Sequence, residues 1–293
     1  ACEYVESFLH FHPKAEIILN IDNDHLDYFK NLDNIKEAFK KYVKLLPDDG
    51  LLVVNADDKN STGLDKLTKA KCVTFGINNS DANFVSKNIK FDKNGFASFD
   101  VYKDKVFFDS FKLMVPGIHN VLNATACIAL CNNYGIPNEA IKAAFISFTG
   151  ANRRLEYKGS FNNISVFDDY AHHPTEIKAT ADSINRKVFN ESWVVFQPHT
   201  YSRLKNLLDD FADSLLSFDH IVLADVYAAR EKNIFNISSK DLADKLNSLG
   251  KPVQYISSFE EIVEFLKKSA KPNDIILTLG AGTVTDIGSM LMK

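Results

Sequence analysis

Four short stretches of the chain gather side chains suited to binding charged small molecules. Aspartates, histidines, arginines or closely spaced glycines cluster at residues 168–176, 197–203, 225–232 and 280–283. Each stretch directly follows a run of apolar residues that predicts a buried strand. In an open parallel α/β sheet, ligands bind along the edge formed by the carboxyl ends of the strands. The pattern therefore predicts a binding crevice at that edge.

Histidines of these stretches stand where helices are expected to begin. His172 and His173 precede Pro174, and proline suits the first turn of a helix. His199 and Arg203 are four residues apart and share one face if a helix begins near residue 200. An arginine fork at that point suits a substrate carboxylate. The alternatives are solvated loop histidines in the first stretch and an exposed helix start in the second.

A glycine pair and an arginine pair are suited to phosphate groups. Gly280 and Gly282 allow the backbone to approach a ligand closely at the start of a helix, although a tight turn explains them equally well. Arg153 and Arg154 are interpreted either as a pair that holds phosphates or as an exposed pair.

The first half of the chain carries two further candidate groups. Residues 22–27 form an acidic stretch around His25, which suits a divalent cation; a polar loop with helix-capping aspartates is the alternative. His119, Asn120 and Asn123 begin a predicted helix, and His119 and Asn123 share one face. Amides at such a place are suited to the edge of a purine, and simple helix capping is the alternative.

Length and composition indicate the class of protein. A chain of 293 residues predicts two domains, and 45% hydrophobic with 25% charged residues is typical of a soluble globular protein. The net charge of −4 argues against a broad nucleic-acid footprint, and no apolar stretch approaches the roughly 20 residues that span a bilayer. The four cysteines form no CxxC pair, which predicts reduced thiols and a cytoplasmic location.

The first half reads as a mixed α/β domain. Apolar runs predict strands at 15–21, 51–55 and 71–76. Between 83 and 115, short apolar runs alternate with Asp-Lys-Asn-Gly and Lys-Asp-Lys turns, which predicts antiparallel hairpins. Helices are expected at 33–46, 119–134 and from Pro137 to about Phe148.

The second half reads as a doubly wound sheet with helices on both faces. Strands are expected at 164–170, 192–198, 220–227, 252–257 and 274–280. Helices are expected between them at 174–188, 201–217, 239–248 and 258–269. This alternation is typical of a parallel sheet. The predicted domains are residues 1–150 and 151–293.

The motifs taken together resemble those of the Mur ligase family. The matching segments are HNVLNA (119–124), GANRRLE (150–156), DDYAHHPTE (168–176), FQPHTYSR (196–203), DVYAAREK (225–232) and TLGAG (278–282). The opening segment, ACEYVESFLHFHPKAEIILNIDNDHLDYF, is similar to the central domain of that family. The resemblance covers essentially the whole chain. AHHPTE and FQPHTYSR favour the members that add L-alanine to UDP-N-acetylmuramate.

The resemblance implies an ATP-dependent, ADP-forming ligase of peptidoglycan precursor synthesis, with ATP and Mg²⁺ as cofactors. In such a ligase the substrate carboxylate attacks the γ-phosphate of ATP, and the amine of L-alanine then displaces phosphate from the acyl phosphate. This chemistry needs neutralised phosphates and two oriented substrates. The implied fold is the C-terminal part of a central ATPase domain, with a mixed and partly antiparallel sheet, followed by a Rossmann-like domain that binds the amino acid.

Roles for single residues follow from their positions in these motifs. Glu3 and His25 are the implied Mg²⁺ ligands. The residues implied at ATP are His119, Asn120, Asn123, Arg154, Asp169 and Tyr170. His172 and Arg203 are the implied catalytic residues, because they position L-alanine; His173, His199 and Arg230 join them as substrate-binding residues. Catalysis is expected to be electrostatic, without one acid–base residue acting alone.

The chain departs from the family pattern at three points. The phosphate loop, GxxGK[ST], does not occur in residues 1–293. We therefore expect that loop and a UDP-binding domain upstream, and no turnover by this chain alone. Thr283 stands where many members carry an acidic residue, and whether Asp286 replaces it is left open. No carbamoylated lysine is assigned.

Three other functions are kept as alternatives. A related ligase joins a preformed peptide to UDP-N-acetylmuramate. A nucleotide-binding dehydrogenase would share the doubly wound half, but no G-x-G-x-x-G follows its first strand. A nucleotide-binding module without turnover is the third alternative.

Overall fold

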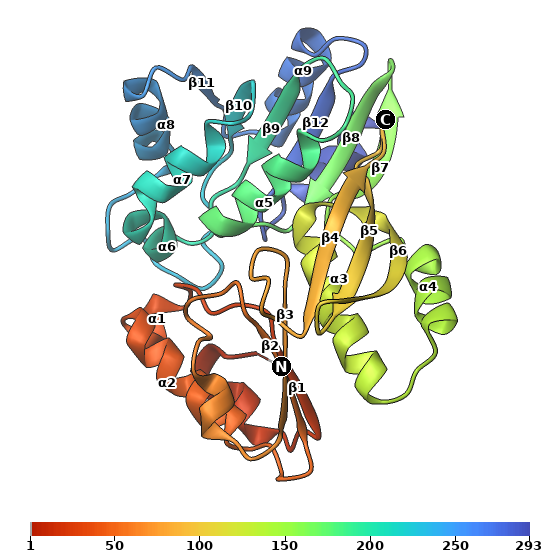
Figure 1. Cartoon of the computed structure of the whole chain (residues 1–293). Helices are drawn as coiled ribbons and strands as arrows, with labels where there is room; N and C mark the ends of the chain where they lie inside the picture. Colours follow the sequence, from red (N-terminus) through yellow and green to blue (C-terminus); the bar gives the residue numbers. More distant parts are fainter. Residues whose placement is uncertain (1) are drawn as a thin grey trace. The chain divides into compact units, whose positions relative to one another are not determined.

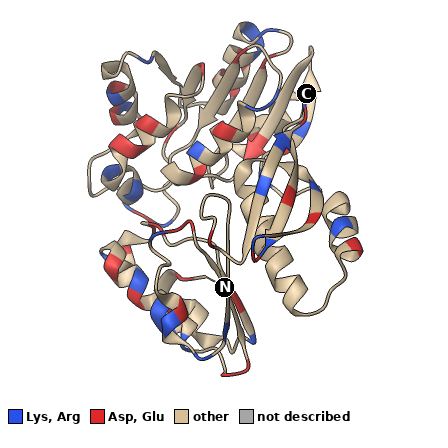
Figure 2. Ribbon diagram, in the orientation of Figure 1, with Lys and Arg blue, Asp and Glu red and all other residues tan. Residues whose placement is uncertain are grey.

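The computed structural model describes residues 2–293, and the chain divides into two compact units (Figure 1). Unit 1 runs to Asp92 and resumes over Phe96–Thr149, whereas unit 2 comprises Lys93–Gly95 and Gly150–Lys293. Acidic and basic residues are interspersed in each unit (Figure 2). Among the described residues, no helix combines the length and the apolarity that crossing a membrane requires.

Unit 1 is built on a six-stranded mixed sheet in the order β1 to β6. The strands are β1 (Ala15–Ile18), β2 (Leu51–Asn55), β3 (Lys71–Gly76), β4 (Phe84–Phe91), β5 (Phe96–Lys103) and β6 (Val106–Pro116). The first four are parallel to one another, and β4, β5 and β6 are antiparallel. The predicted mixed sheet with antiparallel hairpins is therefore confirmed. The first strand ends at Ile18, three residues earlier than expected.

Helices cover both faces of this sheet. They are η1 (Tyr4–His10), α1 (Leu26–Phe29), α2 (Leu32–Val43), η2 (Leu64–Leu67), α3 (Ile118–Asn133) and α4 (Asn138–Ser147). Successive residues of a strand point to opposite faces. Leu52 therefore packs in the core that includes the buried residues of α2, and Val53 packs in the core that includes those of α3.

Unit 2 contains a second six-stranded sheet in the order β11-β10-β9-β12-β8-β7. Its strands are β7 (Glu156–Phe161), β8 (Ile164–Asp169), β9 (Ser192–Phe196), β10 (His220–Leu223), β11 (Val253–Tyr255) and β12 (Ile275–Leu279). The five strands β8 to β12 are parallel, as predicted, and β7 adds an antiparallel edge. The Rossmann-like doubly wound class is confirmed.

The helices of unit 2 form two layers. One layer holds α5 (Pro174–Ile184), α6 (Tyr201–Asn206), α7 (Leu208–Leu215) and α8 (Ser239–Ser248), and the other holds α9 (Phe259–Ser269) and α10 (Thr285–Leu291). The helix expected over 201–217 is interrupted at Leu207, whose φ of −124° is not helical. The chain moves outward from β8 to β11 and then returns through β12, which lies between β8 and β9. This reversal is the place where such sheets bind ligands.

Candidate active site

The four predicted stretches lie along one edge of the unit 2 sheet, at the carboxyl ends of β8, β9, β10 and β12. Backbone hydrogen bonds join neighbouring stretches: Gly280 N donates to Asp169 O (3.1 Å), and Tyr227 N donates to Pro198 O (2.8 Å). Gln197 N donates to Leu279 O at 3.0 Å. The prediction that these stretches share one edge is confirmed within unit 2, and we call this edge the rim.

Arg153 joins the first and last stretches of the rim. Its Nε donates to Asp168 Oδ2 at 2.8 Å, and its terminal nitrogens donate to the carbonyl oxygens of Gly280 and Gly282. Asp168 is fully buried and also accepts a hydrogen bond from Thr278 Oγ1 (2.6 Å). The guanidinium group of Arg153 is therefore bound to three acceptors within unit 2. Neither sequence-based interpretation of the arginine pair, as a phosphate-binding pair or as an exposed pair, describes Arg153.

Arg154 lies closer to solvent than its neighbour. Its side chain is half exposed, and Nη1 pairs with Glu176 Oε1 at 3.3 Å. Both guanidinium groups face the ring of Tyr170, at 5.0 Å for Arg153 and 5.9 Å for Arg154. Arg154 and Tyr170, two residues predicted to meet ATP, thus lie together on the rim.

Asp169 is buried rather than open to a ligand. Its carboxylate accepts hydrogen bonds from Leu155 N and Ala171 N, both at 2.8 Å. Burial raises the pKa of Asp169 to about 6, and these hydrogen bonds oppose the rise. The carboxylate thus connects the backbone at Leu155 with the backbone at Ala171, a role that the sequence did not indicate.

His172 and His173 differ in what they contact. His172 N donates to Glu176 Oε2 (3.0 Å), and its Nδ1 lies 3.0 Å from Tyr170 O. His173 is the N-cap of α5, where its Nδ1 accepts a hydrogen bond from Thr175 N at 3.3 Å. The imidazole of His172 faces His199 on the rim, whereas the imidazole of His173 caps the N-terminus of α5.

His199 and Arg203 meet as their spacing predicts. Arg203 Nη1 donates to His199 O (3.1 Å) and lies 3.2 Å from His199 Nδ1. Burial, with His172 and Arg203 nearby, lowers the pKa of His199 to about 4. The imidazole is therefore neutral at pH 7. Its ring centroid lies 5.6 Å from that of His172.

Glu231 fastens the 197–203 stretch to the 225–232 stretch, and sequence reasoning gave it no role. It accepts hydrogen bonds from Thr200 Oγ1 (2.6 Å) and Ser202 N (2.9 Å). Burial alone would raise the pKa of Glu231, but these hydrogen bonds outweigh it and the pKa lies below its ordinary value. Arg230, beside it, is exposed.

Unit 1 contains a candidate metal centre. Single ligand atoms of Glu3, Asp24 and His25 lie within 4.8 Å of one another. His25 Nε2 is 3.6 Å from Glu3 Oε1 and 3.7 Å from Asp24 Oδ2. Two carboxylates and one imidazole suit a divalent cation, and Mg²⁺ binds through the carboxylate oxygens in preference to nitrogen. Asp24 thus joins the two ligands that the resemblance implied.

The start of α3 presents the three residues predicted to meet adenine. The N-cap of α3 is Gly117, which has no side chain, so none of the three predicted residues occupies the N-cap position. His119 and Asn123 are exposed one turn apart. Asn120 Nδ2 donates to Pro116 O at 2.7 Å, which holds its amide against the preceding turn.

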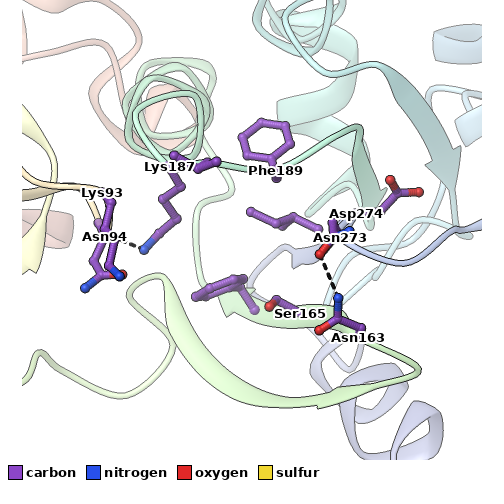
Figure 3. Close-up of a pocket in the computed structure, with 11 residues that line it drawn as sticks. Lys93, Asn94, Asn163, Ser165, Lys187, Phe189, Asn273 and Asp274 are labelled. Atoms are coloured by element: carbon purple, nitrogen blue, oxygen red, sulfur yellow. Dashed lines mark hydrogen bonds between the residues drawn. The ribbon is translucent and has the colours of Figure 1, made fainter.

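A pocket in unit 2 lies at the opposite ends of the strands and does not belong to the rim. Asn163, Ser165, Lys187 and Asn273 contribute to its lining (Figure 3). Asn163 Nδ2 donates to Asn273 Oδ1 (2.6 Å), and Lys187 Nζ donates to Asn94 O (2.7 Å). These polar groups form hydrogen bonds to other residues of unit 2.

Comparison with known proteins connects this geometry to one family. The model of the Mur ligase middle domain matches residues 3–131, and that of the Mur ligase glutamate ligase domain matches residues 153–282. The UDP-N-acetylmuramate–L-alanine ligase of Acetivibrio thermocellus is 48% identical over the whole chain, which spans 62% of that protein's length.

Solved structures agree with these matches. A crystal structure of the UDP-N-acetylmuramate–alanine ligase from Thermotoga maritima superposes with a TM-score of 0.78 at 30% identity, covering 98% of this chain and 60% of that one. A murein peptide ligase from Psychrobacter arcticus gives a TM-score of 0.68 at 25% identity, covering 97% of this chain and 58% of that one.

Proposed function

The chain belongs to the Mur ligase family, and on that premise we propose that it is part of a ligase that joins L-alanine to UDP-N-acetylmuramate. The single observation that carries the proposal is the 48% identity over the whole chain to a ligase of that name. The chain spans 62% of that relative's length, so the ligase activity is proposed for a longer protein. A cytoplasmic location is part of the same proposal.

In the proposed reaction a carboxylate oxygen of UDP-N-acetylmuramate attacks the γ-phosphorus of ATP, and ADP leaves. The amine of L-alanine then attacks the carbonyl carbon of the acyl phosphate. A tetrahedral intermediate forms, phosphate leaves and the amide bond remains after the nitrogen loses a proton. Positioning and charge neutralisation supply most of the catalysis in such a sequence.

The rim is proposed to hold L-alanine. The guanidinium of Arg203 lies beside the neutral imidazole of His199, and His172 faces that imidazole. An arginine fork binds a carboxylate through two parallel hydrogen bonds. Arg203 therefore binds the alanine carboxylate, His199 and His172 orient it, and Arg230 is available to a second carboxylate because its side chain is exposed.

Residues proposed to bind Mg²⁺ or ATP occur in each unit, and each unit is considered by itself. Glu3, Asp24 and His25 would hold Mg²⁺, which when bound offsets the negative charge of the phosphates. The exposed amide of Asn123 suits the edge of adenine, and Arg154 suits a phosphate. Asp169 and His173 act through backbone hydrogen bonds, so we propose that they shape the rim without touching substrate.

Phosphate release from ATP tests the proposal. The assay compares the 293-residue chain with a chimera that adds the preceding segment of the Acetivibrio thermocellus ligase. We expect turnover by the chimera with UDP-N-acetylmuramate and L-alanine, and none by the chain alone. No turnover by a folded chimera would refute the proposal, and turnover by the chain would refute its predicted inactivity.

The acceptor decides between two related ligases. The murein peptide ligase shares the fold at 25% identity, so a preformed tripeptide is the second candidate acceptor. We expect L-alanine to support phosphate release at least tenfold faster than a tripeptide. The reverse order would favour the peptide ligase. Arg203→Lys keeps the positive charge but removes the two parallel hydrogen-bond donors that are proposed to bind the alanine carboxylate. Lys205→Arg, an exchange of the same two residue types on the same helix, is the matched control.

A further inference from the structure

A continuous series of contacts connects Arg153, near the start of unit 2, with His199 on the rim. The series begins at the guanidinium group, which donates to the carbonyl oxygens of Gly280 and Gly282 while it is paired with Asp168. Three separate acceptors thus fix one planar group. The guanidinium group in turn fixes the backbone path of residues 280–282, called the glycine segment, because it binds two carbonyl oxygens of that segment.

Gly282 transmits this position to Tyr227. A Cβ atom on Gly282 would overlap Gln197 Oε1 and would lie 2.6 Å from Tyr227 Cγ. Neither place has room for a Cβ atom, so the bare backbone of Gly282 packs directly on the tyrosine ring. Gln197 Oε1 also accepts a hydrogen bond from Val284 N at 3.1 Å, which holds the following residues against the same place.

Tyr227 in turn covers the imidazole of His199. The two rings are stacked, with centroids 5.7 Å apart and planes 16° from parallel. On its other side His199 meets Arg203 Nη1. A displacement of the glycine segment therefore moves Tyr227, and a displaced Tyr227 exposes the imidazole to water.

We propose that Arg153 is a positioning residue that sets the placement of His199 and Arg203 through Gly282 and Tyr227. The proposal deepens the proposed function and rests on it only in naming L-alanine as what His199 and Arg203 orient. Lysine cannot replace Arg153 here, because one ammonium group does not reproduce a planar fork that reaches Asp168 and two carbonyl oxygens together.

The test is a pH titration of the histidine imidazole resonances of the 293-residue chain by NMR, with His199→Asn to assign the signal. Burial, His172 and Arg203 lower the pKa of His199 to about 4, and Glu231 opposes them. In Arg153→Lys we expect the pKa of His199 to rise by about one unit or more, because the loosened Tyr227 admits water. Arg154→Lys is the matched control and should leave it within about 0.3 units.

A second variant separates positioning from a simple loss of stability. Gly282→Ala pushes on Tyr227 while leaving the Arg153–Asp168 ion pair in place, and we expect the same rise in the pKa of His199. If Arg153→Lys folds cooperatively and the pKa of His199 stays unchanged, the proposal is overturned. If Arg153→Lys does not fold, an unchanged pKa in Gly282→Ala overturns it instead.

Addition of L-alanine distinguishes this inference from the proposed function. In the wild-type chain L-alanine should shift the His199 resonance more than D-alanine does, and Arg153→Lys should weaken that response at least fivefold. Equal responses in the two proteins would overturn the link to L-alanine. If L-alanine changes nothing in the wild-type chain while Arg153→Lys still raises the pKa, the positioning role stands and the assignment of L-alanine fails.

Discussion

The carboxyl group of Glu16 in β1 is buried without a hydrogen-bond partner, and removing its ability to ionise should stabilise the protein at neutral pH. The side chain is 3% exposed, and neither carboxylate oxygen has a hydrogen-bond partner. It shares a face of the sheet with Ile18, on the side of the core that includes Leu52 and Val43. Burial raises the pKa of Glu16 from 4.5 to about 8.

The raised pKa fixes the sign of the pH dependence. Below pH 4.5 the group is protonated in both the folded and the unfolded chain, and its contribution to stability is fully present. Between pH 4.5 and about 8 only the unfolded chain ionises, so stability falls as pH rises. Each unit of pH in that window removes about 1.4 kcal/mol, which amounts to about 3 kcal/mol at pH 7.

Glu16→Gln keeps the shape of the side chain and cannot ionise. We expect it to match the wild type near pH 4.5 and to exceed it by about 3 kcal/mol at pH 7. The assay is urea unfolding from pH 4.5 to 9, with hydrogen exchange of β2 and α2 peptides to report unit 1. Trp193, the single tryptophan, lies in β9 and reports unit 2 as an internal reference.

A matched control uses an exposed acid of the same unit. Glu139→Gln at the start of α4, where the side chain is 84% exposed, should change stability by less than about 0.5 kcal/mol at every pH. Parallel pH profiles for Glu16→Gln and the wild type would refute the reasoning, because the penalty would then not come from ionisation of Glu16.

Three further predictions concern the metal centre, the rim and a helix cap. Mn²⁺ added to the chain should broaden the NMR resonances of His25, and Asp24→Asn should weaken Mn²⁺ binding about tenfold; unchanged binding in Asp24→Asn would contradict the assignment. In the chimeric ligase, Arg203→Lys should raise the KM for L-alanine at least tenfold with the KM for ATP unchanged, as steady-state phosphate release would measure, and an equal rise in both would contradict the role. Ser238 forms a capping box with Asp241 at α8, so Ser238→Ala should lower the free energy of unfolding of unit 2 by about 1 kcal/mol in urea titrations, whereas Ser248→Ala should have a smaller effect.

Much of the fold was predictable because hydrophobic periodicity and turn residues are local signals. The strands at 51–55 and 71–76 begin and end where expected, since they are apolar runs bounded by Gly50 and Gly76. β10 ends at Leu223, four residues earlier than expected; beyond it the pairing with the 197–203 stretch is reduced to an isolated bridge between His199 and Tyr227. Leu207 interrupts a helix whose apolar spacing continues on both sides. Such endings depend on tertiary contacts that the sequence pattern does not contain.

The site was predictable in its location and less so in its detail. Doubly wound topology places strand ends together, so four stretches of polar residues were enough to locate the rim. The sequence could not separate Arg153 from Arg154, because adjacent residues point in different directions and only the packing decides which one is buried. Glu16 escaped notice for the same reason: one acid in an apolar run is compatible with either face of a strand.

The charged side chains of the rim differ in kind from those of the candidate metal centre. The acids of the four stretches are Asp168, Asp169, Glu176, Asp225 and Glu231. Each accepts a hydrogen bond from a donor in unit 2: an arginine, a backbone N–H, a serine or threonine, or the hydroxyl of Tyr255. The guanidinium groups of Arg154, Arg203 and Arg230 suit an anionic substrate, and the three candidate cation ligands, Glu3, Asp24 and His25, lie in unit 1. We therefore expect an anion to bind at the rim of unit 2 and a cation to bind at the candidate metal centre of unit 1.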